Sequence, residues 1–364
     1  MEQFYMPTKI CFQDNVVEEM KQELAKLGSS ALVVTGQQSA FLNGSYMDVK
    51  NALESAGVHH YIFSEVEENP SIQILERAMA LFHTYPVDFV IGVGGGSAID
   101  TAKALAVLLK NRQMKPEDLF LNPDLEALPV VAVPTTAGTG SETTPYAVFT
   151  DDSQRTKMNF KCRVFPKMAL VDVRYFMDIP VHITNSTAVD SLSHIIEGYL
   201  VKKANSYSDA IAEQALNHWA LASGDLLLRN YTKEMRTHLI HASTWAGVVI
   251  SQTGTSLPHG LGYHLTYYHN ISHGKATALF LGELLNHHQD RKKVDKILSS
   301  LGVASVQEFK NRIVQLVGQV EISYQEAADY AQNMYRNKGK LANHPYEVTE
   351  EELLDMILKS LIVY

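Results

Sequence analysis

The first half of the chain alternates short apolar runs with helical patterns, and this order constrains the fold more than any other feature of the sequence. The apolar runs have the length and composition of buried strands and occupy 31–35 (ALVVT), 61–66 (YIFSEV), 89–93 (FVIGV) and 130–135 (VVAVPT). In one helical pattern, Ile72, Leu75 and Met79 share a face. Asn69 and Pro70 are predicted to open that helix, because Asn favours the N-cap and Pro the first helical position. Strand–helix–strand order with short connections predicts a parallel sheet covered by helices.

After about residue 181 the sequence shows helical patterns and no further strand-length run of β-branched residues. The longest of these patterns cover 205–222, 239–253, 305–320 and 349–362. Thr349 and Glu352 have the spacing of a capping box, which predicts the start of the last helix. We therefore predict an α/β domain over residues 1–180 and a helical domain over residues 181–364, with the boundary near 178–184.

The length, net charge and cysteine content of the chain limit the class of protein to which it can belong. A length of 364 residues suits two domains better than one core. The net charge is −9 with no long run of like charge, so neither nucleic acid nor an anionic membrane surface is expected as the main partner. The N-terminal sequence lacks a secretory signal pattern, and no apolar run approaches the roughly 20 residues of a membrane span. Two cysteines outside any CxxC pattern indicate a reducing compartment, so a cytoplasmic location is expected.

Two loops in the first half have the composition of a cofactor site. The run FVIGVGGGSAIDTAK places glycines 94–96 between a predicted strand and a predicted helix. Glycines let backbone amides approach an anion, and the start of the helix adds unpaired N–H groups with partial positive charge. A second loop, VPTTAGTGSE, follows the next strand and offers small hydroxyl side chains. A tight turn would explain the first loop alone, but two such loops at the carboxyl ends of parallel strands favour a pyrophosphate-containing cofactor.

The residues after the strand at 31–35 bear on which dinucleotide binds. An Asp or Glu there usually accepts a hydrogen bond from the ribose 2′-hydroxyl of NAD, and it would repel the 2′-phosphate of NADP. This chain instead has Gly36, Gln37, Gln38 and Ser39. We therefore predict NADP(H) in preference to NAD(H), although no Arg or Lys stands beside Gly36 to bind the phosphate.

Separated carboxylate and imidazole side chains form a candidate metal site. A helix over NSTAVDSLSHIIEGYL would place Asp190 and His194, at i and i+4, on one face. A hydrogen bond on the helix surface would explain this pair taken alone. Further along, His259 follows Pro258 at a predicted helix start and His273 stands at the next one. One carboxylate with two or three imidazoles is a ligand set for Fe²⁺, Zn²⁺ or Mn²⁺.

Five motifs resemble those of the iron-containing (group III) alcohol dehydrogenases: GGGSAIDTAK, PTTAGTGSE, AVDSLSHIIEGYL, PHGLGY and SHGKA. They occur in the family's order with similar spacing, and the resemblance runs from MPTKI near the N-terminus to about residue 280. It implies a dinucleotide-binding α/β domain with a parallel, Rossmann-like sheet, an all-α metal-binding domain, and an active site in the cleft between them. This is the fold shared with dehydroquinate synthase. The resemblance also implies one divalent metal, with Fe²⁺ favoured and Zn²⁺ as the alternative, and a homodimer or higher homo-oligomer.

The resemblance also assigns residues to the site, position by position. The implied metal ligands are Asp190, His194, His259 and His273. The cofactor contacts expected from the loops and the resemblance are Gly36, Ser39, Asn69, Gly95, Gly96, Ser97, Asp100, Thr135, Thr136, Thr139, Ser141 and Lys157. Lys103 completes the family's GGGSxxDxxK pattern, in which Asp100 either orients the nicotinamide amide or holds the loop.

The proton relay is harder to assign. Many members carry a histidine four residues after the third ligand, but here that position holds Tyr263, and His264 follows one residue later. Since one residue on a helix turns by about 100°, His264 cannot simply take over the role. Tyr263 and His264 are therefore the catalytic candidates, with simple packing of Tyr263 as the alternative. His269 has no counterpart and is expected in a solvated loop.

The predicted reaction is hydride transfer between nicotinamide C4 and a small alcohol or aldehyde, with the metal polarising the substrate oxygen. The predicted enzyme is an NAD(P)-dependent alcohol dehydrogenase that works mainly toward aldehyde reduction. One alternative is polyol oxidation of the glycerol dehydrogenase type, in which the metal has fewer ligands. A lyase of the dehydroquinate synthase type would need several Lys and Arg near the metal, where Lys275 is the main cation. A non-enzymatic metal-binding module would not need two cofactor loops.

Overall fold

The computed structural model describes residues 2–151 and 156–364, which form two compact units. One unit consists of Met6–Thr136 and Gly140–Ile179. The other consists of Pro180–Tyr364 with the N-terminal residues up to Tyr5 and the short segment Ala137–Thr139. The chain therefore passes from the α/β unit to the helical unit at Pro180. The two short segments before Pro180, up to Tyr5 and at Ala137–Thr139, also belong to the helical unit.

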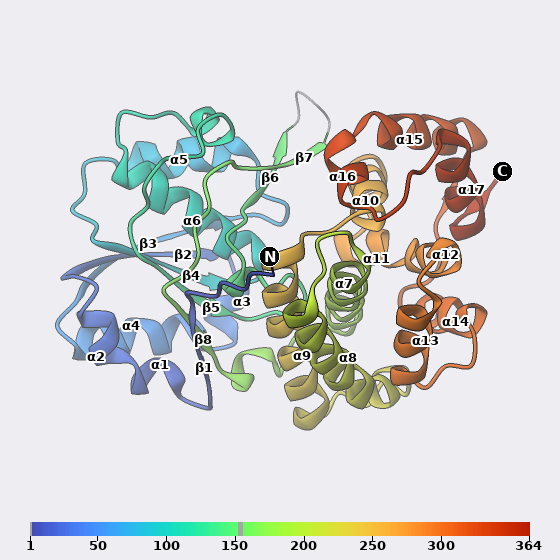
Figure 1. Ribbon diagram of the computed structural model, residues 1–364. Helices are drawn as coiled ribbons and strands as arrows, with labels where there is room; N and C mark the ends of the chain where they lie inside the picture. The colour runs from blue at the N-terminus through green and yellow to red at the C-terminus, as the bar shows by residue number, and fades with distance from the viewer. Residues whose placement is uncertain (1, 152–155) are drawn as a thin grey trace. The chain divides into compact units, whose positions relative to one another are not determined.

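The α/β unit contains a six-stranded parallel sheet with the strand order β1-β8-β5-β4-β2-β3 (Figure 1). Its strands are β1 (Lys9–Phe12), β2 (Ser30–Gly36), β3 (His59–Val66), β4 (Phe89–Gly94), β5 (Val130–Pro134) and β8 (Met168–Val171). The four predicted strands are confirmed as β2 to β5. The sequence did not reveal β1 and β8, because each contributes only four residues, and even the apolar run of β8 is too short to indicate a strand.

Helices cover both faces of this sheet, with α5 and α6 on one face and α1, α2 and α4 on the other (Figure 1). The helical elements of the unit are α1 (Val16–Glu19), α2 (Lys21–Ala25), α3 (Ser39–Leu42), α4 (Ser45–Ser55), α5 (Ile72–Phe82), α6 (Gly96–Lys110) and the 3₁₀ turns η1 (Pro116–Phe120), η2 (Ser141–Thr143) and η3 (Val173–Phe176). An antiparallel hairpin of β6 (Val148–Asp151) and β7 (Thr156–Asn159) completes it. All residues of α6 from Ala98 to Leu109 except Asp100 are buried, since the small Ala side chains allow close packing on the sheet.

The predicted start of α5 is wrong by two residues. Ser71, not Asn69, is the N-cap residue, and the helix begins at Ile72. Asn69 has a left-handed φ of 54°, and the carbonyl of Pro70 accepts a hydrogen bond of 2.8 Å from the Thr150 amide. The Asn-Pro pair therefore forms a turn beside β6 instead of the first helical turn. The predicted apolar face is confirmed, because Leu75 is buried in the core of this unit.

The helical unit is built around α7 (Val181–Leu200), which is buried along most of its length. Around it lie α8 (Ser206–Leu227), α9 (Lys233–Thr253), α10 (Leu257–His269), α11 (His273–Ala278), α12 (Leu281–His287), α13 (Arg291–Ser300), α14 (Val306–Val317), α15 (Tyr324–Arg336), α16 (Lys338–Asn343) and α17 (Glu350–Ser360). The capping box at Thr349 is confirmed as the start of α17. A two-stranded parallel pair, β9 (Glu321–Ile322) and β10 (Ile362–Val363), interrupts the helical pattern.

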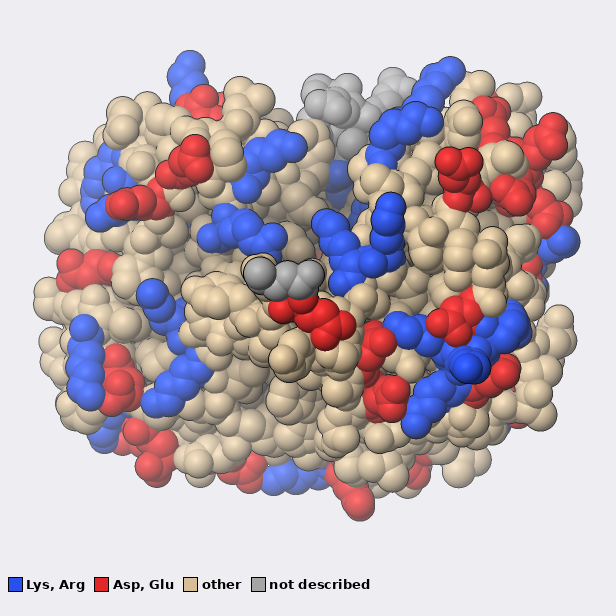
Figure 2. All heavy atoms as spheres, viewed as in Figure 1, with Lys and Arg blue, Asp and Glu red and all other residues tan. Residues whose placement is uncertain are grey.

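Acidic and basic side chains are interspersed over the face of the molecule that Figure 2 presents. This distribution agrees with the modest net charge of −9. Within the described residues, no helix combines the length and the apolar character that a bilayer crossing requires.

Candidate metal centre and cofactor loops

The four residues expected to bind a metal come from three helices of the helical unit. Asp190 and His194 lie one turn apart in the buried middle of α7, so their side chains leave the same face of the helix. His259 lies in the first turn of α10, where a proline marks the helix start. His273 is the first residue of α11. The predicted helix around the Asp–His pair and the two predicted helix starts are confirmed.

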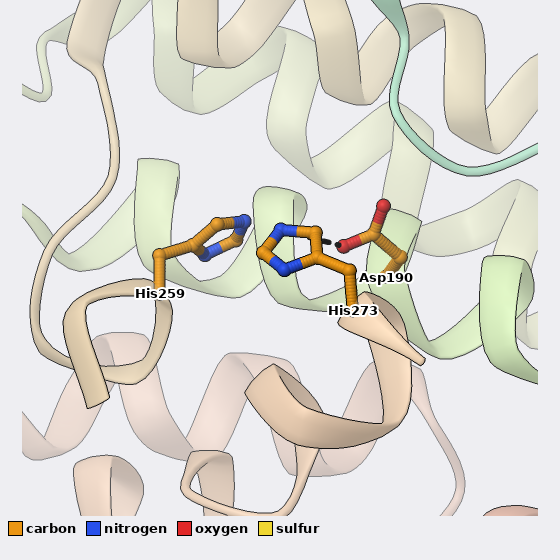
Figure 3. Close-up of side chains that lie close together, drawn as sticks. All are labelled: Asp190, His259 and His273. Carbon is orange, nitrogen blue, oxygen red and sulfur yellow. Dashed lines mark ion pairs between the residues drawn. The ribbon is translucent and has the colours of Figure 1, made fainter. Parts of the chain in front are cut away.

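The side chains of Asp190, His259 and His273 point toward one another (Figure 3). Each offers one ligand atom, and these atoms all lie within 4.8 Å of one another. The Nε2 atom of His273 lies 3.9 Å from Oδ1 of Asp190. The ring centroids of His259 and His273 are 5.2 Å apart. Asp190 and His259 are buried while His273 is partly exposed, so the cluster is not sealed off from solvent.

His194 joins this group through His259. The Nε2 atoms of the two imidazoles lie 2.8 Å apart, and their ring centroids are separated by 4.5 Å. Two nitrogens bound to one ion at about 2.0–2.1 Å lie about 2.8–3.4 Å apart, for bond angles between a right angle and the tetrahedral value. The structure therefore brings Asp190, His259 and His273 into one group, and His194 adjoins this group through His259, with the two Nε2 atoms at a separation that suits a shared cation.

The outer nitrogens of these two histidines face hydrogen-bond acceptors. Nδ1 of His259 donates to the carboxylate of Glu197, and Nδ1 of His194 lies 3.3 Å from the carbonyl oxygen of Gly138. Glu197 is fully buried and also accepts a hydrogen bond of 2.8 Å from the Ser256 amide. Burial raises the pKa of Glu197 to about 7, while the Ser256 amide and the nearby Lys340 ammonium oppose the rise.

These contacts fit a bound divalent metal. Metal-binding histidines usually donate their second N–H to a carboxylate or a carbonyl, which holds the ring and leaves the other nitrogen for the ion. Sequence reasoning missed Glu197, although a signal was present. Glu197 lies seven residues after Asp190 and three after His194, so all three share one face of α7.

The helix α11 packs so closely against α7 at Gly274 that no side chain fits there. A methyl group on Gly274 would lie 1.9 Å from the carbonyl oxygen of Ser186 and 2.8 Å from Cβ of Asp190. Glycine is therefore required here by close backbone approach rather than by an unusual φ. This packing holds His273, the neighbouring residue, beside Asp190.

The two catalytic candidates occupy different faces of α10. The ring of Tyr263 stacks on His273 with centroids 5.6 Å apart, so Tyr263 lies at the metal cluster. The ring of His264 instead stacks on Tyr330, with centroids 4.8 Å apart and an interplanar angle of 8°. Burial lowers the pKa of His264 to about 4. The structure therefore places Tyr263, but not His264, in contact with a predicted ligand.

The substitution His264→Phe is expected to leave the turnover predicted from the sequence within about twofold and to reduce acid sensitivity, because Phe keeps the stacking and cannot take up a proton. The pKa of His264 is about 4 in the folded protein and near 6.5 in the unfolded chain. As the pH drops between these values, the unfolded chain takes up the proton before the folded protein does. The free energy of unfolding therefore falls over this pH range. From about pH 7 to about pH 4, the wild type should lose about 3 kcal/mol more of its unfolding free energy than the variant. Urea unfolding at a series of pH values measures this difference. A large loss of turnover in the variant would instead make His264 a catalytic residue.

In the α/β unit, the glycine loop connects β4 to α6. Gly95 is the N-cap residue of α6, and Gly96 and Ser97 form its first turn. A methyl group on Gly95 would lie 2.9 Å from the hydroxyl oxygen of Thr136, so the glycine loop and the loop after β5 touch. The two predicted loops therefore meet at the carboxyl ends of adjacent strands β4 and β5. The first N–H groups of α6, where Gly95 to Ser97 are only partly buried, can bind a phosphate.

Asp100 and Lys103 are tied into the structure of this second loop. The Asp100 carboxylate accepts hydrogen bonds from the Ser141 hydroxyl and, at 2.9 Å, from the Val148 amide. The Lys103 ammonium is fully buried and donates to Ser141 at 2.8 Å and to the Tyr146 carbonyl at 2.7 Å. Burial lowers the pKa of Lys103 to about 8. Of the two roles considered for Asp100, these contacts support holding the loop.

The remaining predicted cofactor residues lie in several places. Lys157 donates a hydrogen bond of 2.6 Å to the side-chain oxygen of Asn69. Gly36 ends β2, and Ser39 begins α3 after Gln37 and Gln38. Thr135 follows β5 directly, and its amide donates to the Gly94 carbonyl at 2.9 Å. Thr139 belongs to the segment that groups with the helical unit.

Comparison with known proteins gives matches along nearly the whole chain. The family model described as "Iron-containing alcohol dehydrogenase" matches residues 7–173, and that described as "Fe-containing alcohol dehydrogenase family, C-terminal" matches residues 184–359. The chain is similar to the NAD-dependent methanol dehydrogenase of Bacillus methanolicus, with 31% identity over 75% of this chain and 72% of that protein. It is also similar to the lactaldehyde reductase of Escherichia coli, with 28% identity over 84% and 82% of the two chains.

Solved structures agree with these matches. The crystal structure of an iron-containing alcohol dehydrogenase from Thermotoga maritima superimposes with a TM-score of 0.92. The two sequences are 38% identical, and the match covers 99% of each chain. The structure of the archaeal Red Sea brine pool alcohol dehydrogenase gives a TM-score of 0.88 at 25% identity, again over 99% of each chain.

Proposed function

The chain belongs to the iron-containing alcohol dehydrogenase family, and on that premise we propose that it reduces small aldehydes to alcohols with NADP(H) at a four-ligand metal centre. The proposed ligands are Asp190, His194, His259 and His273. The observation that carries this proposal is their convergence from three helices, with Glu197 holding the Nδ1 side of His259. Fe²⁺ is the proposed metal, and Zn²⁺ suits the same nitrogen and oxygen donors.

The residues of the centre have distinct roles in the proposal. A divalent metal would supply Lewis acidity at the substrate oxygen, and the nicotinamide would exchange hydride with the carbinol carbon. Asp190 provides the one negative charge among the four ligands. His194 and His259 present Nε2, because Gly138 and Glu197 engage their Nδ1 atoms. The Tyr263 hydroxyl is the proposed proton carrier for the substrate oxygen, since its ring lies on His273.

We further propose that the glycine loop at Gly95–Ser97 binds the pyrophosphate of the cofactor, supported by the position of these partly buried residues at the start of α6. The NADP(H) preference is supported by the absence of a carboxylate between Gly36 and Ser39, where β2 passes into α3. A homodimer or larger homo-oligomer and a cytoplasmic location stay predictions from the sequence.

Metal-stripped protein reloaded anaerobically with Fe²⁺ or Zn²⁺ tests the function. With a panel of short aldehydes, including glyceraldehyde and lactaldehyde, we expect oxidation of NADPH that requires the metal and exceeds the NADH rate by at least about tenfold, equivalent to about 1.4 kcal/mol. Faster turnover with NADH would overturn the cofactor preference alone. No turnover of any aldehyde or alcohol by the metal-loaded protein with either cofactor would overturn the proposed reaction.

A further inference from the structure

A second group of histidines lies outside the metal centre, on the helices α8 and α9. These two helices run antiparallel and pack side by side (Figure 1). His218 lies in the middle of α8, while His238 and His241 lie one turn apart on α9. All three side chains are partly exposed, so an ion from solvent can reach them. None of these residues contributes to the centre formed by Asp190 and its partners.

The imidazoles of this second group lie close together. The Nδ1 atoms of His218 and His238 are 3.1 Å apart, in a hydrogen bond that only one of them can donate. This separation falls inside the range of about 2.8–3.4 Å that two nitrogens adopt on one ion. The ring of His241 stacks on His218 with centroids 4.8 Å apart. A third imidazole therefore lies directly beside the facing pair.

We propose that His218 and His238 form a surface binding site for a divalent first-row transition metal ion, with His241 as an auxiliary imidazole. In the bound form, the ion takes the place of the proton between the two Nδ1 atoms. The histidine that loses this proton to solvent takes up another at Nε2, so both imidazoles remain neutral ligands. Neutral imidazole is a ligand for Zn²⁺, Ni²⁺ and Cu²⁺, with Cu²⁺ bound most tightly of these ions. The ion joins α8 to α9 and adds a cross-link to the helical unit.

The local electrostatics favour the metal-binding form of these residues. Burial lowers the pKa values of His218 and His241, and the neighbouring imidazoles lower them further. Neutral imidazole is the form that binds metal, so the lowered pKa values of His218 and His241 favour metal binding near neutral pH.

Zinc titration of the metal-stripped chain against a competing chelator tests this proposal. We expect wild-type protein to take up about two ions per chain and the His218→Gln/His238→Gln variant about one, because Gln keeps the hydrogen bonding but removes both imidazoles. Aldehyde reduction by the variant should be unchanged. The control His59→Ala/His60→Ala removes a histidine pair at the start of β3 and should leave uptake at the wild-type level. Equal zinc uptake by the wild type and the His218→Gln/His238→Gln variant would overturn the site.

Retention on immobilised Ni²⁺ gives a second readout with untagged protein. The three histidines of the α8–α9 site are all partly exposed, whereas Asp190 and His259 are buried, so the resin should bind mainly at the α8–α9 site. We expect wild type to elute later than the His218→Gln/His238→Gln variant, and equal elution would count against the proposal. The two metal sites share no ligand. An Asp190→Asn variant that still takes up two zinc ions would contradict the proposed catalytic centre and leave the α8–α9 site standing.

Discussion

Asp190→Asn is expected to abolish metal-dependent turnover in a chain that remains folded. The substitution keeps the size of the side chain but removes the one anionic ligand among the four proposed residues. Loss of an outer-shell partner alone typically costs about 10–100-fold in metal affinity, so loss of this ligand should cost at least about 100-fold. Metal titration with a competing chelator measures the affinity, and NADPH oxidation with the reloaded protein measures the rate.

Glu283→Gln provides a matched control for this change. Glu283 is a buried carboxylate in the same unit, paired with Lys310 at 2.6 Å, and lies outside the proposed centre. Its substitution should lower the free energy of unfolding while metal affinity stays at the wild-type value. If Asp190→Asn bound metal as tightly as the wild type, Asp190 would not be a ligand. If both variants lost metal equally, global destabilisation would account for the effect.

Gly274→Ala should damage both the stability of the helical unit and its metal centre. The added methyl group would lie 1.9 Å from the Ser186 carbonyl oxygen, so α11 must move away from α7. Overpacking of this kind costs about 1–3 kcal/mol, and we expect about 2–3 kcal/mol because the obstacle is backbone. The same movement separates His273 from Asp190, so metal affinity should fall at least about tenfold. Chemical unfolding and metal titration of one preparation measure both effects.

Gly224→Ala is the control for the intrinsic effect of the added methyl group. Gly224 lies inside α8, and a methyl group there would meet no atom within 4 Å. Its substitution should raise the free energy of unfolding by about 0.5–1 kcal/mol, because Ala loses less conformational entropy than Gly in a helix. If Gly274→Ala raised the free energy of unfolding by the same amount and left metal affinity unchanged, the close contact between α11 and α7 at Gly274 would not be required.

Local patterns in the sequence were sufficient for much of the architecture. Buried strands β2 to β5 stand out as short apolar runs, because a strand covered on both faces needs an apolar side chain at nearly every position. Helical periodicity alone places Asp190 and His194 on one face of α7. The short strands β1 and β8 escaped detection, since four residues carry too little pattern to differ from a loop.

Other features depend on partners that are distant in the chain. His269 was expected in a solvated loop, but it ends α10, and its Nε2 lies 3.0 Å from the Tyr330 hydroxyl. The Asn69-Pro70 pair forms a turn, because the Pro70 carbonyl accepts a hydrogen bond from Thr150. Helical periodicity places Glu197 on the face of Asp190 and His194, but its hydrogen bond to His259 follows only from the packing of α10 in the structure.

The sequence by itself determined which residue types could serve as metal ligands, which helix carries two of them, and the glycine loop that leads into α6. These features follow from residue chemistry and from periodicities within a few helical turns. Only the tertiary structure decided that α10 and α11 bring His259 and His273 to Asp190. It also decided that Tyr263 rather than His264 contacts this cluster. The contact between the histidines of α8 and α9 likewise appears only in the tertiary structure. Contacts between residues that are distant in the sequence depend on how whole helices pack. Helix packing is set by the summed contacts of many side chains rather than by any one segment.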